Sequence, residues 1–243
     1  MSSTTYVRYE VLRNFRNWRF IAFSLAYPLA LFFAVGLPNR HATFDGAAFP
    51  VYFMTAMATV GTVVAIVSTG ARISVERSAG WTRQMRTTPL TARAHITAKV
   101  LCAYLMAILV IAALCLAGTT LGVHLSAAHW LTVIGMLLVG LVPFAVLGIL
   151  LGHLIPADSM LPAVGGSVIV FCLLGGAYGF LIATSGVMFQ VIKALPSYWL
   201  VQAGKTAAGG HGWPAQAWIV IAIWTVVLVP IAVLIYKRDT SRA

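Results

Sequence analysis

The apolar positions of the chain gather into long runs, and the polar positions are confined to the segments between them. A helix needs about 20 mostly apolar residues to cross the hydrocarbon core of a membrane. The pattern therefore predicts an all-α integral membrane protein in which six transmembrane helices form one domain over residues 1–243. The six runs are residues 20–37, 51–70, 99–122, 130–152, 161–185 and 217–236.

Composition agrees with this class. Of the 243 residues, 60% are hydrophobic and 9% are charged, whereas a soluble domain carries about 25% charged residues. The first run follows 19 residues that include four arginines. Such a lead-in is long for a signal peptide, so we expect this run to be retained as a span. The three cysteines lie singly in apolar runs, without the spacing of a disulfide framework or a metal site.

The basic residues are distributed unevenly along the chain. Residues 1–19, residues 71–99 and the C-terminal tail hold 13 of the 16 lysines and arginines. Cytoplasmic segments of membrane proteins carry an excess of positive charge, so we expect a multi-pass protein of the plasma or inner membrane with both termini in the cytoplasm. The net charge of +11 follows from this asymmetry, and it favours contact with membrane lipids over binding of nucleic acid.

Residues 1–19 predict a cytoplasmic amphipathic helix. Val7, Val11, Phe15 and Trp18 recur at helical spacing on one face, and most of the arginines fall elsewhere. Such a helix lies in the interface of a membrane. Membrane anchoring and contact with a partner protein explain the pattern equally well, and one helix can serve both roles.

Residues 71–98 predict a cytoplasmic loop long enough for two short helices and a turn. Within it, VERSAGWTRQMRTTPL (residues 75–90) is basic and helix-forming as far as Pro89, because the residue before a proline is disfavoured in a helix. Trp81 and Met85 share one face of this helix, and the arginines share another. The helix could lie on anionic lipid headgroups, or it could be a docking surface for a protein.

The same region resembles a known family. Residues 76–100, ERSAGWTRQMRTTPLTARAHITAKV, closely resemble the loop after the second span of ABC-2 type transporter permeases. The shared pattern is a Glu-Arg pair, a glycine, a short basic helix, Pro-Leu and a small polar run into the third span. Where family members often have an acidic residue after Gly-Thr, this chain has Arg83. The resemblance extends over nearly the whole chain and includes LPSYWL (residues 195–200) before the last span.

The resemblance implies a transport subunit rather than an enzyme. Such permeases pair with a separate ATP-binding-cassette ATPase, usually two permeases with two ATPases, and they export drugs, antibiotics, lipids or glycans. This chain is then expected to bind no cofactor, to leave ATP and magnesium to the partner, and to join a second permease copy in a homodimer or heterodimer. The helix over residues 76–88 is expected to be the coupling helix that docks on the ATPase. Its expected docking residues are Glu76, Arg77, Gly80, Trp81, Arg83, Met85 and Arg86.

Two further segments bear on transport. Thr55, Thr59 and Thr62 share a face of the second span, and they either line a possible substrate path or pack helix on helix; we favour packing. Residues 186–216 are too apolar for an exposed loop, so we expect outer re-entrant helices there, between spans five and six. An outer aromatic belt is predicted at Tyr198, Trp199, Trp213 and Trp218.

Glycines indicate where the spans come close together or break. Three pairs of glycines have the spacing that permits two helices to approach closely: Gly118 and Gly122, Gly148 and Gly152, and Gly175 and Gly179. The span over residues 161–185 carries Gly165-Gly166 and Gly175-Gly176, so we expect it to bend or break.

Other functional classes find less support. The apolar runs contain no Asp, Glu or Arg, and Lys99 only marks the entrance of the third span. An ion-gradient-driven carrier needs a titratable group in the membrane; Asp158 and His153 could form a relay, but a tight interfacial turn explains them better. No pairing of nucleophile and base and no set of metal ligands points to an enzyme. A membrane-embedded scaffold that docks a cytosolic protein is therefore the main alternative, followed by the ion-gradient carrier.

Overall fold

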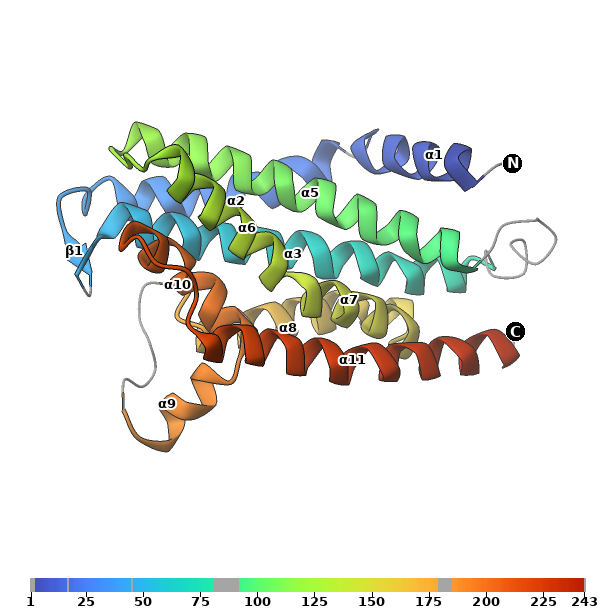
Figure 1. Cartoon of the computed structure of the whole chain (residues 1–243). Helices are drawn as coiled ribbons and strands as arrows, with labels where there is room; N and C mark the ends of the chain where they lie inside the picture. The colour runs from blue at the N-terminus through green and yellow to red at the C-terminus, as the bar shows by residue number, and fades with distance from the viewer. Residues whose placement is uncertain (1–2, 17, 45, 81–91, 179–184, 243) are drawn as a thin grey trace.

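The computed structural model of the chain describes residues 3–16, 18–44, 46–80, 92–178 and 185–242. Its helices lie side by side in an elongated bundle, with α1 and the end of α11 at one end and a short β-hairpin at the other (Figure 1). The elements are α1 (Ser3–Arg16), α2 (Trp18–Gly36), β1 (Thr43–Phe44), β2 (Ala47–Ala48), α3 (Phe49–Ser78), α5 (Ala92–Thr120), α6 (Ala127–Gly140), α7 (Val142–Leu154), η1 (Ala157–Ser159), α8 (Met160–Leu174), α9 (Gly186–Lys193), α10 (Pro196–Ala208) and α11 (Ala215–Arg242).

The helices agree with the predicted membrane class. Within the described residues, five helical segments are long and apolar enough to cross a membrane, with α6 and α7 forming one of them, and they correspond to the second to sixth predicted spans. The first predicted span, residues 20–37, corresponds to α2, whose described apolar stretch Ser24–Gly36 is shorter than the others. The sixth crossing therefore stays a prediction. The five spans are Phe49–Ser78, Ala94–Thr120, Ala127–Leu154, Ala157–Leu174 and Ala215–Arg238.

Helix α3 forms the centre of the bundle. In its most apolar stretch 89% of the residues are buried, against 22% for α8 and 17% for α11. It packs against α2, α5, α7, α8 and α10. By contrast, α8 and α11 expose large apolar side chains such as Leu161, Ile169 and Val226, which are compatible with contact with lipid tails.

Helices α3 and α7 touch through their backbones. A Cβ atom on Gly70 would lie 2.2 Å from the carbonyl carbon of Gly148. A Cβ atom on Gly152 would lie 2.4 Å from the carbonyl oxygen of Gly70. No side chain fits at either position, so the close approach predicted for Gly148 and Gly152 is confirmed.

The fifth predicted span is shorter than expected. Helix α8 ends at Leu174, and Gly176 follows with a φ of +78°, a left-handed conformation that glycine adopts most easily. The Tyr52 hydroxyl on α3 donates a 2.8 Å hydrogen bond to the carbonyl of Gly176 and so fixes this turn. The expected break is therefore found at Gly175-Gly176, whereas Gly165-Gly166 lie within α8.

Residues 186–216 contain two short helices, α9 and α10, at the end of the bundle opposite to α1 (Figure 1). The indole of Trp199 donates a 2.8 Å hydrogen bond to the carbonyl of Lys193. The indole of Trp224 on α11 donates a bond of the same length to the carbonyl of Ala194. These bonds tie the turn between α9 and α10 to α11. Two short helices were expected here, and their re-entry into the membrane stays a prediction.

Three of the four residues assigned to an aromatic belt lie inside the protein instead. Tyr198, Trp199 and Trp213 are only 8%, 6% and 5% exposed. The first two lie on α10, which packs against α3, α6 and α8, and Trp213, which follows α10, packs at Gly140 of α6. Trp218 is 47% exposed and is the only one of the four that fits a belt. Sequence alone does not distinguish an aromatic residue at a membrane interface from one in a protein core.

Candidate functional site

The segment predicted as a coupling helix begins inside α3. This helix continues through Ser78, so Glu76 and Arg77 occupy its last turn. Gly80 ends it with a φ of +76°, and its N–H donates a 3.0 Å bond to the carbonyl of Arg77. The prediction of a separate helix over residues 76–88 is therefore wrong at its start, because residues 76–78 belong to α3, which ends before Gly80.

The connection between α3 and α5 is shorter than the predicted loop over residues 71–98. Residues 71–78 belong to α3, and α5 begins at Ala92, which leaves residues 79–91. Trp81, Arg83, Met85 and Arg86 lie outside the described residues, and their docking role stays a prediction. We call residues 79–91 the connecting loop, a name that refers only to their place in the sequence between α3 and α5.

A buried ion cluster lies at the base of the connecting loop. Glu76 Oε1 accepts a 2.5 Å hydrogen bond from Lys99 Nζ and another from the guanidinium of Arg13. Glu10 Oε1 accepts bonds of 2.6 Å and 2.8 Å from the same two cations. These four residues, named here the ion cluster, alternate in charge and join α1, α3 and α5.

Further polar contacts flank the ion cluster. The Tyr6 hydroxyl lies 2.8 Å from Nδ1 of His95, and Nε2 of the same histidine lies 3.9 Å from Glu76 Oε2. The guanidinium of Arg72 donates a 2.6 Å bond to Oδ1 of Asn14. Together with the ion cluster, these contacts dock α1 onto α3 and α5.

Burial makes the ion cluster sensitive to the loss of Lys99 or of either glutamate, whereas the Arg13 side chain is 42% exposed. The Lys99 side chain is 1% exposed and the Glu10 side chain 7%. A buried charge costs several kcal/mol unless it is paired and hydrogen-bonded, and here each charge has two opposite partners. Burial, together with Glu10 and Glu76 nearby, raises the pKa of the Tyr6 phenol, so this hydroxyl stays protonated and available to His95.

Helix α1 turns a polar face toward the bundle. Tyr6, Glu10 and Asn14, four residues apart, are at most 8% exposed, whereas Val7 and Val11 on the predicted apolar face are half-buried. Trp18 begins α2 instead of ending α1, and the side chains of Phe15 and Trp18 lie outside what the structure describes. A helix is thus present in the predicted place, and its position in the membrane interface stays a prediction.

The last turn of α3 also holds the end of α7. The Arg77 guanidinium donates to the carbonyls of Gly152, over 3.2 Å, and of His153. The Ser74 hydroxyl donates a 2.6 Å bond to the carbonyl of Ile155. The last carbonyls of a helix have no partner within it and carry partial negative charge, so a guanidinium at this position satisfies them. Arg77 therefore has a structural role within the chain.

The three threonines proposed to line a substrate path are buried between helices. Thr55, Thr59 and Thr62 are fully buried. Their hydroxyls donate to carbonyls of α3, such as Thr62 to Ala58 over 2.6 Å, and Thr55 also reaches the carbonyl of Val201 on α10 over 3.0 Å. This arrangement fits the packing alternative. A substrate path along this face stays a prediction, and it requires α3 and α10 to separate.

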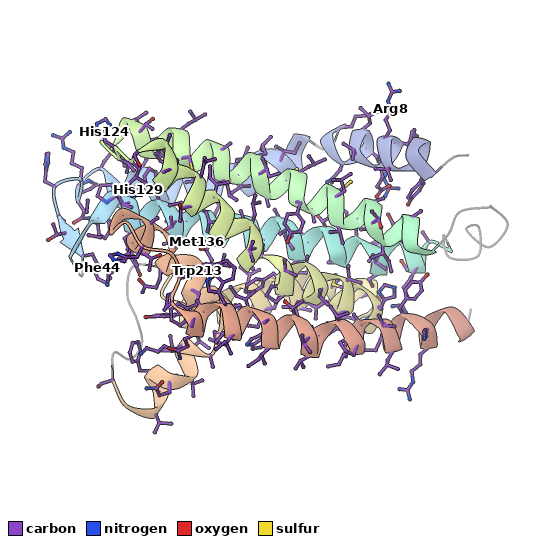
Figure 2. The ribbon with its side chains drawn as sticks, in the orientation of Figure 1. Arg8, Phe44, His124, His129, Met136 and Trp213 are labelled. Carbon is purple, nitrogen blue, oxygen red and sulfur yellow. The ribbon has the colours of Figure 1, made fainter. Side chains whose placement is uncertain are left out.

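The histidines and Asp158 do not gather into a second site. His153 lies with Nδ1 2.9 Å from the carbonyl of Ile149, and Asp158 is exposed in the turn that follows α7. His124 and His129 lie at the opposite end of the bundle (Figure 2). Within the described ranges, no group of three or more His, Cys, Asp or Glu residues could hold a metal ion.

The sequence analysis placed Glu76 in the candidate docking site but did not predict the other members of the ion cluster. Glu10 and Arg13 were not assigned a role, and Lys99 was interpreted only as a marker of the third span. One signal was present in the sequence: the chain has only two glutamates, one before the first predicted span and one after the second. Carboxylates so rare and so placed are rarely left unpaired.

Comparison with known proteins identifies the family. A family model described as "ABC-2 type transporter" matches residues 3–206. The chain belongs to the ABC-2 type transporter family and is a membrane transport permease. A curated relative, "Putative transport permease YvfS" of Bacillus subtilis (strain 168), is 29% identical over 196 residues, which are 78% of each chain. No solved structure matches the chain.

Proposed function

We propose that this permease is the transmembrane subunit of an ATP-driven exporter. A separate ATP-binding-cassette ATPase docks on the connecting loop and supplies the energy, and the cargo is a hydrophobic or amphipathic compound such as a drug, an antibiotic or a lipid. Two permease copies, identical or different, assemble with two ATPases. The observation that carries the proposal is the ion cluster at the base of the connecting loop, in a chain of this family.

The ion cluster fits a point of force transmission. Helix α3 ends two residues after Glu76, α5 begins at Ala92, seven residues before Lys99, and Glu76 and Lys99 are bonded to each other. A push on the loop therefore acts on both helices at once. It also acts on α1 through Glu10 and Arg13, and on α7 through Arg77.

Helix α3 offers a route from this base to the outer end. It runs through the centre of the bundle, and at its other end Tyr52 and Thr55 are bonded to Gly176 and Val201. A displacement of α3 that is driven by ATP binding in the partner would reach the turn after α8 and helix α10. Alternating exposure of the cargo site requires two such arrangements with different contacts.

A scaffold that docks a cytosolic protein without transporting anything would use the same loop. The two functions differ in whether the docked protein hydrolyses ATP and whether a compound crosses the membrane. An ion-gradient carrier would need neither the loop nor an ATPase. The experiment that follows separates all three.

The first experiment is affinity purification of the solubilised chain from its host, with copurifying proteins identified by mass spectrometry. The variant carries Arg83→Glu and Arg86→Glu in the connecting loop. The control carries Arg40→Glu, a charge reversal on the exposed turn between α2 and the β-hairpin. We expect an ATP-binding-cassette ATPase with the wild type and the control, and its loss with the variant.

Reconstitution of the chain with that ATPase in liposomes then tests transport. Lipophilic compounds that are cargo should stimulate ATP hydrolysis and accumulate on the side away from the ATPase. Capture of an ATPase without stimulation by any compound would favour the scaffold, and transport that follows an imposed ion gradient without ATP would favour the carrier.

A further inference from the structure

His95 lies between the N-terminal helix and the ion cluster. It belongs to the first turn of α5, three residues after Ala92, and its side chain is buried. On one side of the ring, Nδ1 lies 2.8 Å from the Tyr6 hydroxyl on α1. On the other side, Nε2 lies 3.9 Å from Oε2 of Glu76 on α3. One imidazole ring therefore faces two other helices with its two nitrogens.

The contact with Tyr6 determines which nitrogen of His95 carries the proton. A neutral imidazole has one N–H donor and one acceptor nitrogen. Tyr6 is buried, and in the part of the chain that the structure describes its hydroxyl bonds to His95 alone. The phenol therefore donates to Nδ1, because the reverse orientation would leave a buried O–H without an acceptor. The proton of neutral His95 then lies on Nε2, which faces Glu76.

Glu76 presents an acceptor to this N–H. Its Oε1 accepts the bonds from Lys99 and Arg13, whereas its Oε2 is buried and has no hydrogen bond within the described residues. A buried carboxylate oxygen without a donor is unfavourable. At 3.9 Å, the Nε2–H of His95 lies about 1 Å beyond hydrogen-bonding distance. A donor and an acceptor thus face each other without a bond, which is unusual in a buried place.

This open contact lies where the proposed function requires movement. Glu76 is in the last turn of α3 and His95 is in the first turn of α5, so the connecting loop separates them in the sequence. Two functional arrangements of a protein must differ in their contacts if a ligand is to shift one to the other. The bonds of the ion cluster are already formed, whereas the contact between His95 and Glu76 needs a displacement of about 1 Å to close.

We propose that His95 is a positioning residue for energy coupling: its Nε2–H bonds to Glu76 Oε2 when the partner ATPase binds ATP, and this bond is open in the arrangement described above. Tyr6 holds the ring in the tautomer that the bond requires. The bond gives Glu76 Oε2 a donor and draws the ends of α3 and α5 together, so it stabilises the ATP-bound arrangement. The inference rests on the proposed function, because the ATPase supplies the displacement.

Two substitutions separate the two sides of the ring. In His95→Asn the amide takes the place of Nδ1, where its oxygen can accept from Tyr6, but it is too short to reach Glu76. In His95→Gln the amide takes the place of Nε2, where its N–H can reach Glu76, but the acceptor for Tyr6 is lost. The matched control is His129→Asn, at the opposite end of the bundle (Figure 2).

Stability and coupling should respond differently to these variants. The unfolding temperature is measured for the full chain in detergent. The dissociation constant of a non-hydrolysable ATP analogue is measured for the permease assembled with its ATPase. We expect His95→Asn to keep the unfolding temperature of the wild type but to raise this dissociation constant about tenfold, the equivalent of about 1.4 kcal/mol. We expect His95→Gln to lower the unfolding temperature and to leave the dissociation constant nearly unchanged, and the control to change neither.

The tautomer is measured separately, without the ATPase. The nitrogen NMR shifts of the His95 ring in the isolated chain distinguish the protonated from the unprotonated nitrogen, and the signal that His95→Asn removes assigns them. We expect the proton on Nε2. Addition of the ATPase and the ATP analogue should shift this Nε2–H signal, because the N–H then donates to a carboxylate.

Three results would overturn the inference while leaving the proposed function intact. Equal dissociation constants for the wild type and His95→Asn would mean that the contact does not close on ATP binding. A loss of both stability and ATP affinity in His95→Asn would mean a general structural role. A proton on Nδ1 in the isolated chain would mean that the ring cannot donate to Glu76. Failure of the proposed function is distinct, since no ATPase would then assemble with the wild type, and the inference would fall with it.

Discussion

Glu76 and Lys99, 23 positions apart in the sequence, form a 2.5 Å hydrogen-bonded ion pair at the base of the connecting loop. Glu76 lies in the last turn of α3, and Lys99 lies seven residues after Ala92, where α5 begins. The two helices that flank the connecting loop are therefore joined by a side-chain contact near its base. A partner protein that moves this loop therefore acts on α3 and α5 as a linked pair and not on each helix separately.

Lys99→Met should destabilise the protein strongly. The substitution keeps the volume but leaves the carboxylates of Glu10 and Glu76 with Arg13 as their shared partner in a buried place. Loss of one partner of a buried pair costs about 3–5 kcal/mol. We expect a large fall in the unfolding temperature of the detergent-solubilised chain, measured by the intrinsic fluorescence of tryptophan.

A double variant separates charge from packing in this experiment. Lys99→Met combined with Glu76→Gln removes one positive and one negative charge, so it should recover part of the lost stability. If the double variant were less stable than the wild type by the sum of the two single effects, Glu76 and Lys99 would not interact energetically, and the ion cluster would not stabilise the fold.

Tyr6→Phe should loosen α1 while leaving the rest of the bundle unchanged. It removes the hydroxyl that lies 2.8 Å from His95, and a buried hydrogen bond of this kind contributes about 1 kcal/mol. We expect faster hydrogen exchange at the backbone amides of α1. Tyr9→Phe is the control, since Tyr9 is 64% exposed on the same helix, and equal acceleration by both variants would contradict the docking of α1 through Tyr6.

Gly70→Ala should disrupt the contact between α3 and α7. The added methyl group would lie 2.2 Å from a backbone atom of α7, and backbone cannot move aside as a side chain can. The control is Gly135→Ala in α6, where a Cβ meets nothing within 4 Å and where alanine favours the helix by about 0.5–1 kcal/mol. The two variants should shift the unfolding temperature in opposite directions; a neutral Gly70→Ala would contradict the close packing.

Trp224→Phe should release the turn between α9 and α10 from α11. It removes the indole N–H that donates to the carbonyl of Ala194 and keeps an aromatic ring in place. We expect increased hydrogen exchange in residues 189–195, with little change elsewhere. Trp218→Phe, a substitution on the same helix at a half-exposed tryptophan, should leave that exchange unaltered.

Most of the fold was predictable because long apolar runs have few alternatives in a membrane. Five of the six predicted spans correspond to helical segments that are long enough to cross, and the break at Gly175-Gly176 coincides with a left-handed glycine. The end of α3 before Gly80 was not predicted. Helix ends were less predictable. Residues 71–78 are polar enough to be taken for a loop, yet they continue α3, because Ser74, Glu76 and Arg77 find partners on other helices.

The polar face of α1 could not be predicted from periodicity. An apolar stripe on a short helix next to a membrane predicts contact with lipid, and Val7 and Val11 form such a stripe. The opposite face is buried because its partners, His95 and Lys99, are supplied by a helix that follows about 90 residues later. Only the arrangement of the helices in space brings these residues together.

The absence of side chains between Gly70, Gly148 and Gly152 has a mechanical consequence. Two helices separated by side chains can slide past each other as rotamers adjust, but here backbone meets backbone and such shear is blocked. Helices α3 and α7 are therefore expected to move together as one rigid body. Because α11 packs on α7, a rotation that begins at the connecting loop would move α11 as well. It would thereby change the outer surface of the permease.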